Sequence, residues 1–314
     1  VQRAISRFLR KLFKWPWGYY EYYLFSFTRA LKNICPQPDA VVVFNDITPL
    51  RHIKKAVPGA KVAVYLQNEL HVDRKILNRS LPFVNPFIAA SGYIRDYMIK
   101  TYDITPDRLV VALNCVNLET FKPRQDYLKK RDTLHVLYIG RIDPNKGVDI
   151  AVDAVRVLQK EGLPVQLTVA GGVWFYARDG DLTDPFLQKL KGKMDAVEAK
   201  YLGHVGRPDV PALIRENDVV CILSRSNEPF GLVILEAMAS GCAVVTSNRG
   251  GIPEAAGGAA MLVDPDDFDS VVDCLRLLAT DHDVIKTQKI KSVERAAKVS
   301  WSVTVDVLEQ ALMK

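Results

Sequence analysis

The chain lacks any long hydrophobic run. No stretch reaches the roughly 18 uninterrupted apolar residues that a membrane-spanning helix needs, and no clean apolar segment follows the charged amino end. We therefore predict neither a transmembrane helix nor a secretion signal. The 314 residues are 48% apolar and 25% charged, which argues against a disordered chain and leaves room for two domains of typical size.

Cysteine and histidine are also scarce. The five cysteines are odd in number and widely spaced, which predicts buried thiols in a reducing compartment rather than a disulfide framework. The five histidines never show the i, i+4 spacing of a helical zinc pair. Asp179 and Asp181 form a D-x-D string, but no third ligand lies near them in the sequence. We therefore predict a cytoplasmic protein that holds no metal and needs no cofactor.

Net charge is confined to the amino-terminal tenth of the chain. Residues 1–35 contain seven basic residues, one acidic residue and ten aromatic residues, and the rest of the chain is balanced, so the net charge of +6 belongs to this segment. Interleaved basic and aromatic residues are typical of a helix that lies on an anionic membrane surface. The alternative is that the apolar face packs on a domain core and the basic side is solvated. Nucleic acid is a poorer match, because the basic cluster is short.

Short apolar runs alternate with helical stretches beyond residue 35, which is the βαβ pattern of parallel α/β domains. The first group of predicted strands covers residues 40–44, 61–66, 87–90 and 108–112. The second group covers residues 134–139, 165–170, 201–202, 218–223, 243–246 and 259–263. We predict that a polar segment at 120–133 is the linker between the two groups. We therefore predict a domain over 1–128, a second doubly wound domain over 129–298, and an amphipathic closing helix over 299–314.

Ligands of such sheets bind at the carboxyl ends of the strands, so the turns that follow the strands are the places to look for chemistry. The turn after residues 134–139 reads GRIDPNKG and contains Arg141 and Lys146 between Gly140 and Gly147. Two cations and two glycines before a helix form a plausible anion cradle, because the backbone can approach closely and the helix offers free N–H groups. The alternative is a glycine-rich structural turn with solvated charges.

Two carboxylates mark a second candidate site in the segment SRSNEPFGLVILEAMA. Glu228 lies in the loop after the strand at 218–223, and Glu236 lies eight residues later in a helix that we expect to start near Phe230. A rise of about 1.5 Å per residue places Glu236 some 9 Å along that helix, so the two carboxylates can line one cleft at different depths. Glu236 is flanked by apolar residues, and burying it is costly unless something binds it, as a sugar hydroxyl would. The alternative is that Glu236 points to solvent.

Together these segments resemble family 4 of the retaining glycosyltransferases, the "glycosyl transferases group 1" type. GRIDPNKGVD is similar to that family's phosphate loop, and NEPFGLVILEAMASGCAVV is similar to its E-x7-E motif, here Glu228 and Glu236. YLGHV at 201–205 and SNRGGIPE at 247–254 also resemble segments of that family, and all these segments follow one another in the family's order along the chain. The resemblance implies a GT-B fold, in which two Rossmann-like doubly wound domains face a cleft. The family's usual first strand and glycine-rich loop have no counterpart before residue 40, so the amino-terminal domain looks incomplete.

The resemblance also implies roles for individual residues. Arg141 and Lys146 would neutralise the donor's diphosphate in place of a metal ion, and Glu236 would hold the ribose hydroxyls. Glu228, with the amides at the helix start, would orient the sugar, and the base would lie near His204 and Val205. The implied donor site therefore comprises Gly140, Arg141, Lys146, His204, Val205, Glu228, Phe230, Gly231, Leu232 and Glu236.

One departure concerns the catalytic histidine of the family. Related sequences often carry a His where this chain has Gln67, and His71 lies four residues later. His71 is therefore a candidate catalytic residue beside Glu228, Arg141 and Lys146, with Gln67 and solvent exposure of His71 as the alternatives.

The resemblance implies transfer of a sugar from a nucleotide diphosphate sugar, such as a UDP- or GDP-sugar, to a glycan or lipid-linked acceptor at the cytoplasmic membrane face, with an α-linked product. The rival hypothesis is a non-catalytic assembly or coat protein that retains the nucleotide pocket. A nucleotide-sugar epimerase or a glycan phosphorylase is a third reading. Retention of both cations and both carboxylates favours the enzyme.

Overall fold

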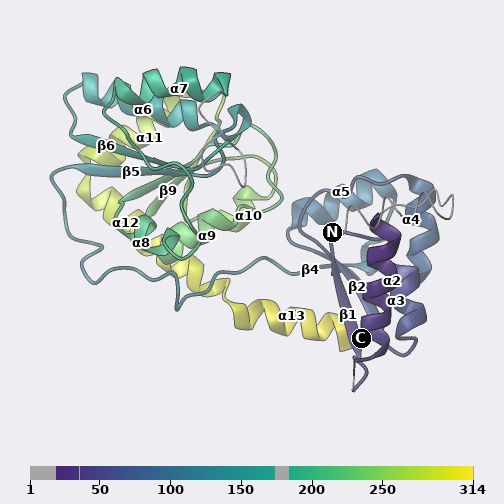
Figure 1. The fold of residues 1–314 in the computed structure, drawn as a ribbon. Helices are drawn as coiled ribbons and strands as arrows, with labels where there is room; N and C mark the ends of the chain where they lie inside the picture. Colours follow the sequence, from purple (N-terminus) through teal and green to yellow (C-terminus); the bar gives the residue numbers. More distant parts are fainter. Residues whose placement is uncertain (1–18, 35, 174–183, 314) are drawn as a thin grey trace. The chain divides into compact units, whose positions relative to one another are not determined.

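The computed structural model describes residues 19–34, 36–173 and 184–313, with the backbone alone for 19–25 (Figure 1). Its contacts divide them into two compact units. The first takes in the described residues up to Ala90, Ile94–Val111 and the chain from Leu308; the second takes in Ser91–Tyr93 and Ala112–Val307. Residues 1–18, Asp179 and Asp181 lie outside the described residues, so the expectations about them stay predictions.

The first unit is built on a four-stranded parallel sheet in the order β1-β2-β3-β4. Its strands are β1 (Ala40–Phe44), β2 (Lys61–Leu66), β3 (Phe87–Ala89) and β4 (Leu109–Val111). The connecting helices are α2 (Tyr19–Lys32), α3 (Leu50–Ala56), α4 (Arg74–Ser80) and α5 (Gly92–Tyr102), with short 3-10 turns at Leu81–Phe83 and Pro106–Arg108. The central strand β2 is buried along five of its six residues, as its continuous apolar run predicts.

The second unit contains a six-stranded parallel sheet in the order β10-β9-β8-β5-β6-β7. Its strands are β5 (Leu134–Ile139), β6 (Val165–Ala170), β7 (Lys200–Tyr201), β8 (Val219–Ile222), β9 (Ala243–Ser247) and β10 (Met261–Val263). The chain runs outward from β5 in one direction and then restarts beside it with β8. This is the doubly wound order, and its switch point between β5 and β8 is where ligands of such sheets bind.

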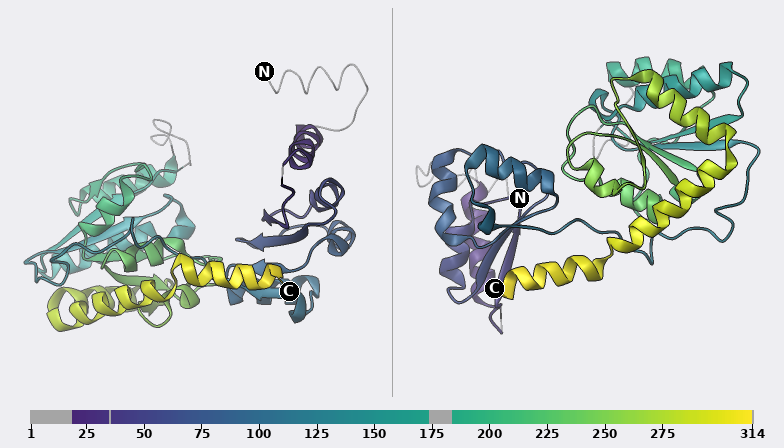
Figure 2. Two further views of the ribbon diagram at one scale, coloured as in Figure 1. Left: turned by 90° about the horizontal axis from the view of Figure 1, so that it is seen from below. Right: turned by 180° about the vertical axis from the view of Figure 1, so that it is seen from behind.

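Helices cover both faces of this sheet (Figure 1). One face carries α6 (Val148–Lys160), α7 (Pro185–Asp195) and α11 (Phe268–Thr280). The other carries α8 (Val210–Arg215), α9 (Leu232–Ala239), α10 (Ile252–Ala256) and α12 (His282–Lys298), and α13 (Trp301–Met313) follows. The three layers of this unit can be followed again in both views of Figure 2.

Strand alternation explains the two cores of the second unit. Val136 and Tyr138 of β5 belong to the core beneath α6, α7 and α11, whereas Leu137 belongs to the core beneath α9. Successive side chains of a strand point to opposite faces, so a strand covered on both sides must be apolar throughout.

Every predicted strand is present in the structure, and the bounds differ by at most two residues. The predicted start of the Glu236 helix, near Phe230, is two residues too early. The helix α9 begins at Leu232, with Gly231 in the left-handed region as its N-cap, so Phe230 precedes the helix. Gly231 leaves the chain free to turn sharply there, which hydrophobic spacing cannot reveal.

None of the described helices is both long enough and apolar enough to cross a bilayer.

A buried charge cluster fixes the connecting segment 120–133 to the second unit. Asp218, just before β8, is 4% exposed and accepts a hydrogen bond of 2.8 Å from the Lys289 ammonium of α12, which is 5% exposed. Lys289 also donates to the Tyr127 carbonyl at 3.0 Å. Arg131 lies 3.5 Å from the other carboxylate oxygen, which accepts from the His135 amide at 3.1 Å. Removing one member of such a cluster leaves a charge buried without its partner.

We expect Lys289→Met to lower the free energy of unfolding by about 3 kcal/mol, because Asp218 would lose its closest cation in a buried site. Lys291→Met, at an exposed position of the same helix, removes the same charge and is expected to change stability by less than about 0.5 kcal/mol. Chemical denaturation of both variants measures the difference. Equal stabilities would show that Asp218 does not depend on Lys289.

Candidate functional site

The loop after β5 is held in shape by its own polar groups. The Tyr138 hydroxyl donates to the Arg141 carbonyl at 2.6 Å, and the Asp143 carboxylate accepts from the Asn145 amide at 2.8 Å, capping the 3-10 turn Pro144–Lys146. Burial raises the pKa of Tyr138 well above its usual value, so the hydroxyl stays protonated as a donor. These bonds fix the path of the backbone on which Arg141 and Lys146 stand.

A single glycine lets this loop lie against the end of β8. Gly147 has φ +70°, and a Cβ placed there would lie 1.9 Å from the Leu223 carbonyl oxygen. The Asn145 carbonyl accepts from the Arg225 amide at 2.8 Å and from the Ser224 hydroxyl at 3.2 Å. The loops that follow β5 and β8 are therefore joined backbone to backbone at the switch point of the sheet.

An ion pair between Arg225 and Asp149 reinforces the same junction. The Arg225 guanidinium donates to both carboxylate oxygens of Asp149 in α6, at 2.9 and 2.8 Å, and to the Pro144 carbonyl at 2.6 Å. Asp149 raises the pKa of Arg225, and such bidentate pairs are among the stronger charged contacts.

The junction brings Lys146 and Glu228 into direct contact. The Lys146 ammonium donates to Glu228 Oε1, and the Ser224 hydroxyl donates to the same oxygen at 2.6 Å. Both charged side chains are mostly buried, with 25% of Lys146 and 18% of Glu228 exposed. The sequence predicted both residues as site members, and the structure adds Ser224, whose hydroxyl orients the carboxylate.

The loop after β9 also contacts the loop that carries Glu228. The Gly251 amide donates to the Glu228 carbonyl at 2.7 Å, and a Cβ at Gly250, which has φ +60°, would lie 2.3 Å from the same oxygen. The two glycines of the SNRGGIPE segment therefore let its backbone close on Glu228.

Glu236 is buried within α9 and does not point freely to solvent. Its side chain is 4% exposed, and Oε1 accepts from the Arg207 guanidinium at 2.7 Å, while 73% of the Arg207 side chain is exposed. Burial raises the pKa of Glu236, and the positive charge of Arg207 opposes that rise. A buried carboxylate with a solvent-exposed cationic partner is poised to accept further hydrogen bonds from a ligand.

Arg207 is a site residue that the sequence analysis missed. It follows the YLGHV segment in the loop after β7, and its guanidinium also lies 5.7 Å from the ring centroid of Phe121. The only signal in the sequence was a cation two residues beyond the turn expected to hold the base. Its partner Glu236 lies 29 residues later in the chain, beyond α8 and β8, so the pairing could not be predicted from spacing.

The remaining predicted residues occupy the same edge of the sheet in different ways. The Arg141 guanidinium lies 4.0 Å from Asp143. His204 is exposed, Val205 is half-buried, and Gly203 ties their loop to Gly171 through a 2.7 Å bond from the Gly171 amide. Gly140 is half-buried at the end of β5.

The residues around Gly231 divide between core and surface. The Phe230 side chain is 1% exposed and belongs to the core, whereas Leu232 is 41% exposed. The first turn of α9, which starts at Leu232, leaves amide groups without intrahelical acceptors. The sequence placed these free amides two residues too early.

His71 belongs to the first unit, and its contacts lie there. Its Nε2 is 3.7 Å from Glu69, and its Nδ1 is 3.3 Å from the Tyr97 hydroxyl, while 76% of the His71 side chain is exposed. The Gln67 amide donates to Asn45 Oδ1 at 2.6 Å. A catalytic role for either residue stays a prediction.

No group of three or more His, Cys, Asp or Glu side chains suited to a metal ion occurs among the described residues. The polar edge of the second unit can receive an anion and a polyhydroxyl group. Lys146, Arg141 and the start of α9 offer positive charge, and the carboxylates of Glu228 and Glu236 are acceptors.

We expect Gly147→Ala to lower the free energy of unfolding by at least about 3 kcal/mol, because the added methyl meets the Leu223 carbonyl as well as an unfavourable φ. Gly162→Ala is the matched control, since Gly162 has φ +80° with nothing within 4 Å of a Cβ. Gly162→Ala is expected to lower the free energy of unfolding only by the cost of a left-handed backbone conformation, about 1–2 kcal/mol. Thermal and chemical denaturation compare the two, and equal losses would contradict the tight loop contact.

Glu236 gives the stability a pH dependence of known sign. A carboxyl group whose pKa is raised on folding disfavours the folded state once it ionises, so its contribution is best at low pH and is lost as pH rises. We therefore expect Glu236→Gln to melt higher than the parent at pH 8, with the difference shrinking toward pH 5. Arg207→Gln should melt lower than the parent at pH 8 and approach it at pH 5. A pH-independent difference for both variants would exclude this ionisation as the cause.

Comparison with known proteins identifies the family. The model of the family described as "Glycosyl transferases group 1" matches residues 120–297, which is more than half of the chain. The chain is 28% identical over 235 residues to the putative glycosyltransferase YtcC of Bacillus subtilis, covering 68% of this chain and 56% of that protein. It is 27% identical to spore coat protein SA of the same organism, covering 69% and 61%. The chain thus spans about 56–61% of the length of these relatives.

Three further likenesses extend the comparison. D-inositol 3-phosphate glycosyltransferase of Saccharomonospora viridis is 31% identical over 232 residues, covering 68% of this chain and 52% of that protein. HepE of Anabaena, solved with UDP and glucose, superposes with a TM-score of 0.70 at 19% identity, covering 91% of this chain and 79% of that one. A glycosyltransferase from Rickettsia africae superposes with a TM-score of 0.75 at 17% identity, covering 92% and 81%.

The structural likenesses establish the fold, which is α/β of the GT-B type with Rossmann-like units, as predicted. The family match covers the loops after β5 and β8, which carry Lys146 and Glu228, and the helix α9, which carries Glu236. The chain belongs to the glycosyl transferases group 1 family.

Proposed function

We propose that this chain is a retaining glycosyltransferase that moves a sugar from a nucleotide diphosphate sugar, a UDP- or GDP-sugar, to a glycan or lipid-linked acceptor. The observation that carries the proposal is the cluster of Lys146, Glu228 and Ser224 at the β5/β8 switch point, with the buried Glu236 in the helix that follows. The presence of UDP in the HepE structure supports a donor of this class.

The chemistry requires a stable leaving group. Negative charge grows on the nucleoside diphosphate as the glycosidic bond breaks, and Lys146, Arg141 and the amino end of α9 supply positive charge without a metal ion. Glu236 accepts hydrogen bonds from the two ribose hydroxyls, and the nucleotide base lies against the backbone near His204 and Val205. The hydrogen bonds of the loop after β5 hold the backbone that carries both cations in place, so that only side chains rearrange when the donor binds.

Glu228 has a double task in this proposal. In the free protein it neutralises Lys146, and with the donor bound it accepts a sugar hydroxyl while Lys146 turns to the diphosphate. The acceptor attacks on the face that the leaving group departs from, through an ion-pair-like state, and gives an α-linked product from an α-linked donor. His71 or Gln67 contributes to the sugar side, and a β-linked product would overturn the stereochemical part.

The acceptor and the location of the reaction are proposed from other features. The name of the D-inositol 3-phosphate glycosyltransferase supports a polar, phosphorylated acceptor. The basic and aromatic segment 1–35 supports action at an anionic, cytoplasmic membrane face. Vesicles rich in anionic lipid should then sediment the chain at low salt, and deletion of residues 1–17 should abolish this.

A second candidate function is a non-catalytic assembly role. The similarity to spore coat protein SA favours it, whereas the intact set of Arg141, Lys146, Glu228 and Glu236 favours catalysis. Product formation from a nucleotide sugar and an acceptor separates the two, and an epimerase would convert the donor with no acceptor present.

The donor class is tested by thermal stabilisation with UDP, GDP, ADP and TDP. A nucleotide at about 100 times its dissociation constant should add roughly 2.7 kcal/mol to the free energy of unfolding. Glu236→Ala and Arg141→Ala should abolish the shift. Arg156→Ala, which removes a half-exposed arginine of α6 paired with Asp153, is the charge-matched control and should keep it. Absence of stabilisation by all four nucleotides would contradict a working donor site and favour the assembly role.

A further inference from the structure

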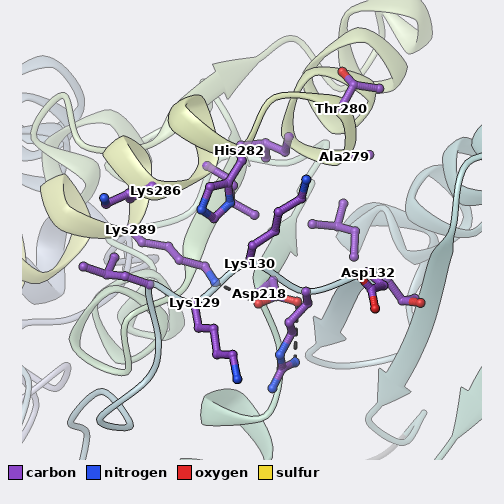
Figure 3. Close-up of a pocket in the computed structure, with 15 residues that line it drawn as sticks. Lys129, Lys130, Asp132, Asp218, Ala279, Thr280, His282, Lys286 and Lys289 are labelled. Carbon is purple, nitrogen blue, oxygen red and sulfur yellow. Dashed lines mark hydrogen bonds and ion pairs between the residues drawn. The ribbon is translucent and has the colours of Figure 1, made fainter.

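A polar pocket of about 290 Å³ lies on the second unit, away from the loops of the donor site (Figure 3). The connecting segment 128–133 forms one wall, and the junction of α11 and α12 forms the other. Leu134, the first residue of β5, and Asp218, just before β8, lie at its floor. The pocket therefore opens at the amino ends of the strands, whereas the donor loops follow their carboxyl ends. A ligand here would not be the nucleotide sugar.

The floor of the pocket carries more positive charge than its carboxylate can balance. The carboxylate of Asp218 lies 2.8 Å from Lys289, 3.5 Å from Arg131 and 4.0 Å from Arg124. Lys289 and Asp218 are almost fully buried, and both arginines are about one quarter exposed. Arg124 lies closer to Asp126, at 3.2 Å, and does not line the pocket. Lys289 and Arg131 therefore share the one carboxylate of Asp218 in a poorly solvated place, and a second anion would relieve the repulsion between them.

Lys289 also has a hydrogen-bond donor to spare. An ammonium group offers three N–H donors, and those of Lys289 reach the Asp218 carboxylate and the Tyr127 carbonyl. In the part of the chain that the structure describes, the third N–H has no acceptor. Lys289 lines the pocket, and Figure 3 shows its ammonium group beside Asp218. Burying an unsatisfied charged donor is unfavourable, so a ligand oxygen at this point would be stabilised.

The rim adds further positive charge. Lys129, Lys130 and Lys286 line the same pocket, and none of them pairs with a carboxylate among the described residues. His282 also lines it, and Asp132 is the second carboxylate of the lining besides Asp218. Five cationic side chains thus surround the pocket against two carboxylates.

We propose that this pocket is a second ligand site, which binds a phosphate group. A phosphate supplies up to two negative charges and several acceptor oxygens, which suits the spare Lys289 donor, the nitrogens of Arg131 that do not face Asp218 and the lysines of the rim. The phosphate comes either from a free phosphate or diphosphate or from the headgroup of a phosphate-bearing lipid. Because the connecting segment forms one wall, a bound phosphate would link that segment to α12. This site goes beyond the proposed transferase activity and does not depend on it.

The test uses the full chain with Lys146→Ala, so that the donor loops lose their central cation. Isothermal titration with pyrophosphate at constant ionic strength is compared for two triple variants of this chain. Lys129→Gln, Lys130→Gln and Lys286→Gln together remove the rim. Lys160→Gln, Lys200→Gln and Lys298→Gln remove equal charge from exposed positions outside the pocket lining. We expect the rim variant to bind pyrophosphate at least tenfold more weakly, and the control variant to bind it as the parent does.

The source of the phosphate is resolved with vesicles. Phosphatidylcholine vesicles with and without phosphatidic acid are sedimented with the same three proteins, all of which share the basic segment 1–35. Pyrophosphate binding that depends on the rim assigns the site to a free phosphate or diphosphate. Rim-dependent binding to phosphatidic acid alone assigns it to a lipid headgroup. If the rim and control variants behave alike with both probes, the proposed site is wrong, whether or not nucleotides bind elsewhere.

Discussion

The candidate site depends on one close backbone approach, that of Gly147 to the Leu223 carbonyl. With φ +70° and no side chain, Gly147 lets the loop after β5 rest on the end of β8. This contact places the Asn145 carbonyl where Arg225 and Ser224 reach it, and it places Lys146 where its ammonium meets Glu228. The doubly wound sheet supplies the switch point, but the glycine makes it a site, because any larger residue would hold the two loops apart.

Two buried carboxylates of the second unit differ in how fully the protein satisfies them. Asp218 is surrounded by Lys289, Arg131, Arg124 and a backbone amide, and these contacts fix the connecting segment to the core. Glu236 has a single cationic partner, and most of that Arg207 side chain faces solvent. Asp218 is thus satisfied within the protein, whereas Glu236 keeps acceptor capacity that the protein does not use, and its burial destabilises the folded protein.

Much of this could be predicted from the sequence. Parallel strands covered on both sides must be apolar, so the ten strands were visible as short hydrophobic runs, and their order along the chain indicated two parallel α/β domains, the second of them doubly wound. Lys146, Glu228 and Glu236 were visible too, because charges next to glycines or inside an apolar helix stand out. The resemblance to the glycosyltransferase family then gave these residues expected roles, which stay predictions.

Pairing between distant residues was beyond the sequence. Arg207 and Glu236 come from different loops and elements, as do Lys289 and Asp218, and neither pair has a fixed spacing that a pattern could reveal. The start of α9 was also misplaced, because the left-handed Gly231 ends the preceding loop by a backbone choice that hydrophobic periodicity does not record. The sequence by itself determined which segments are strands, helices and polar turns, since these follow from local periodicity. Only the tertiary structure decided which charges meet, because that depends on how the sheet order brings separate loops to one edge.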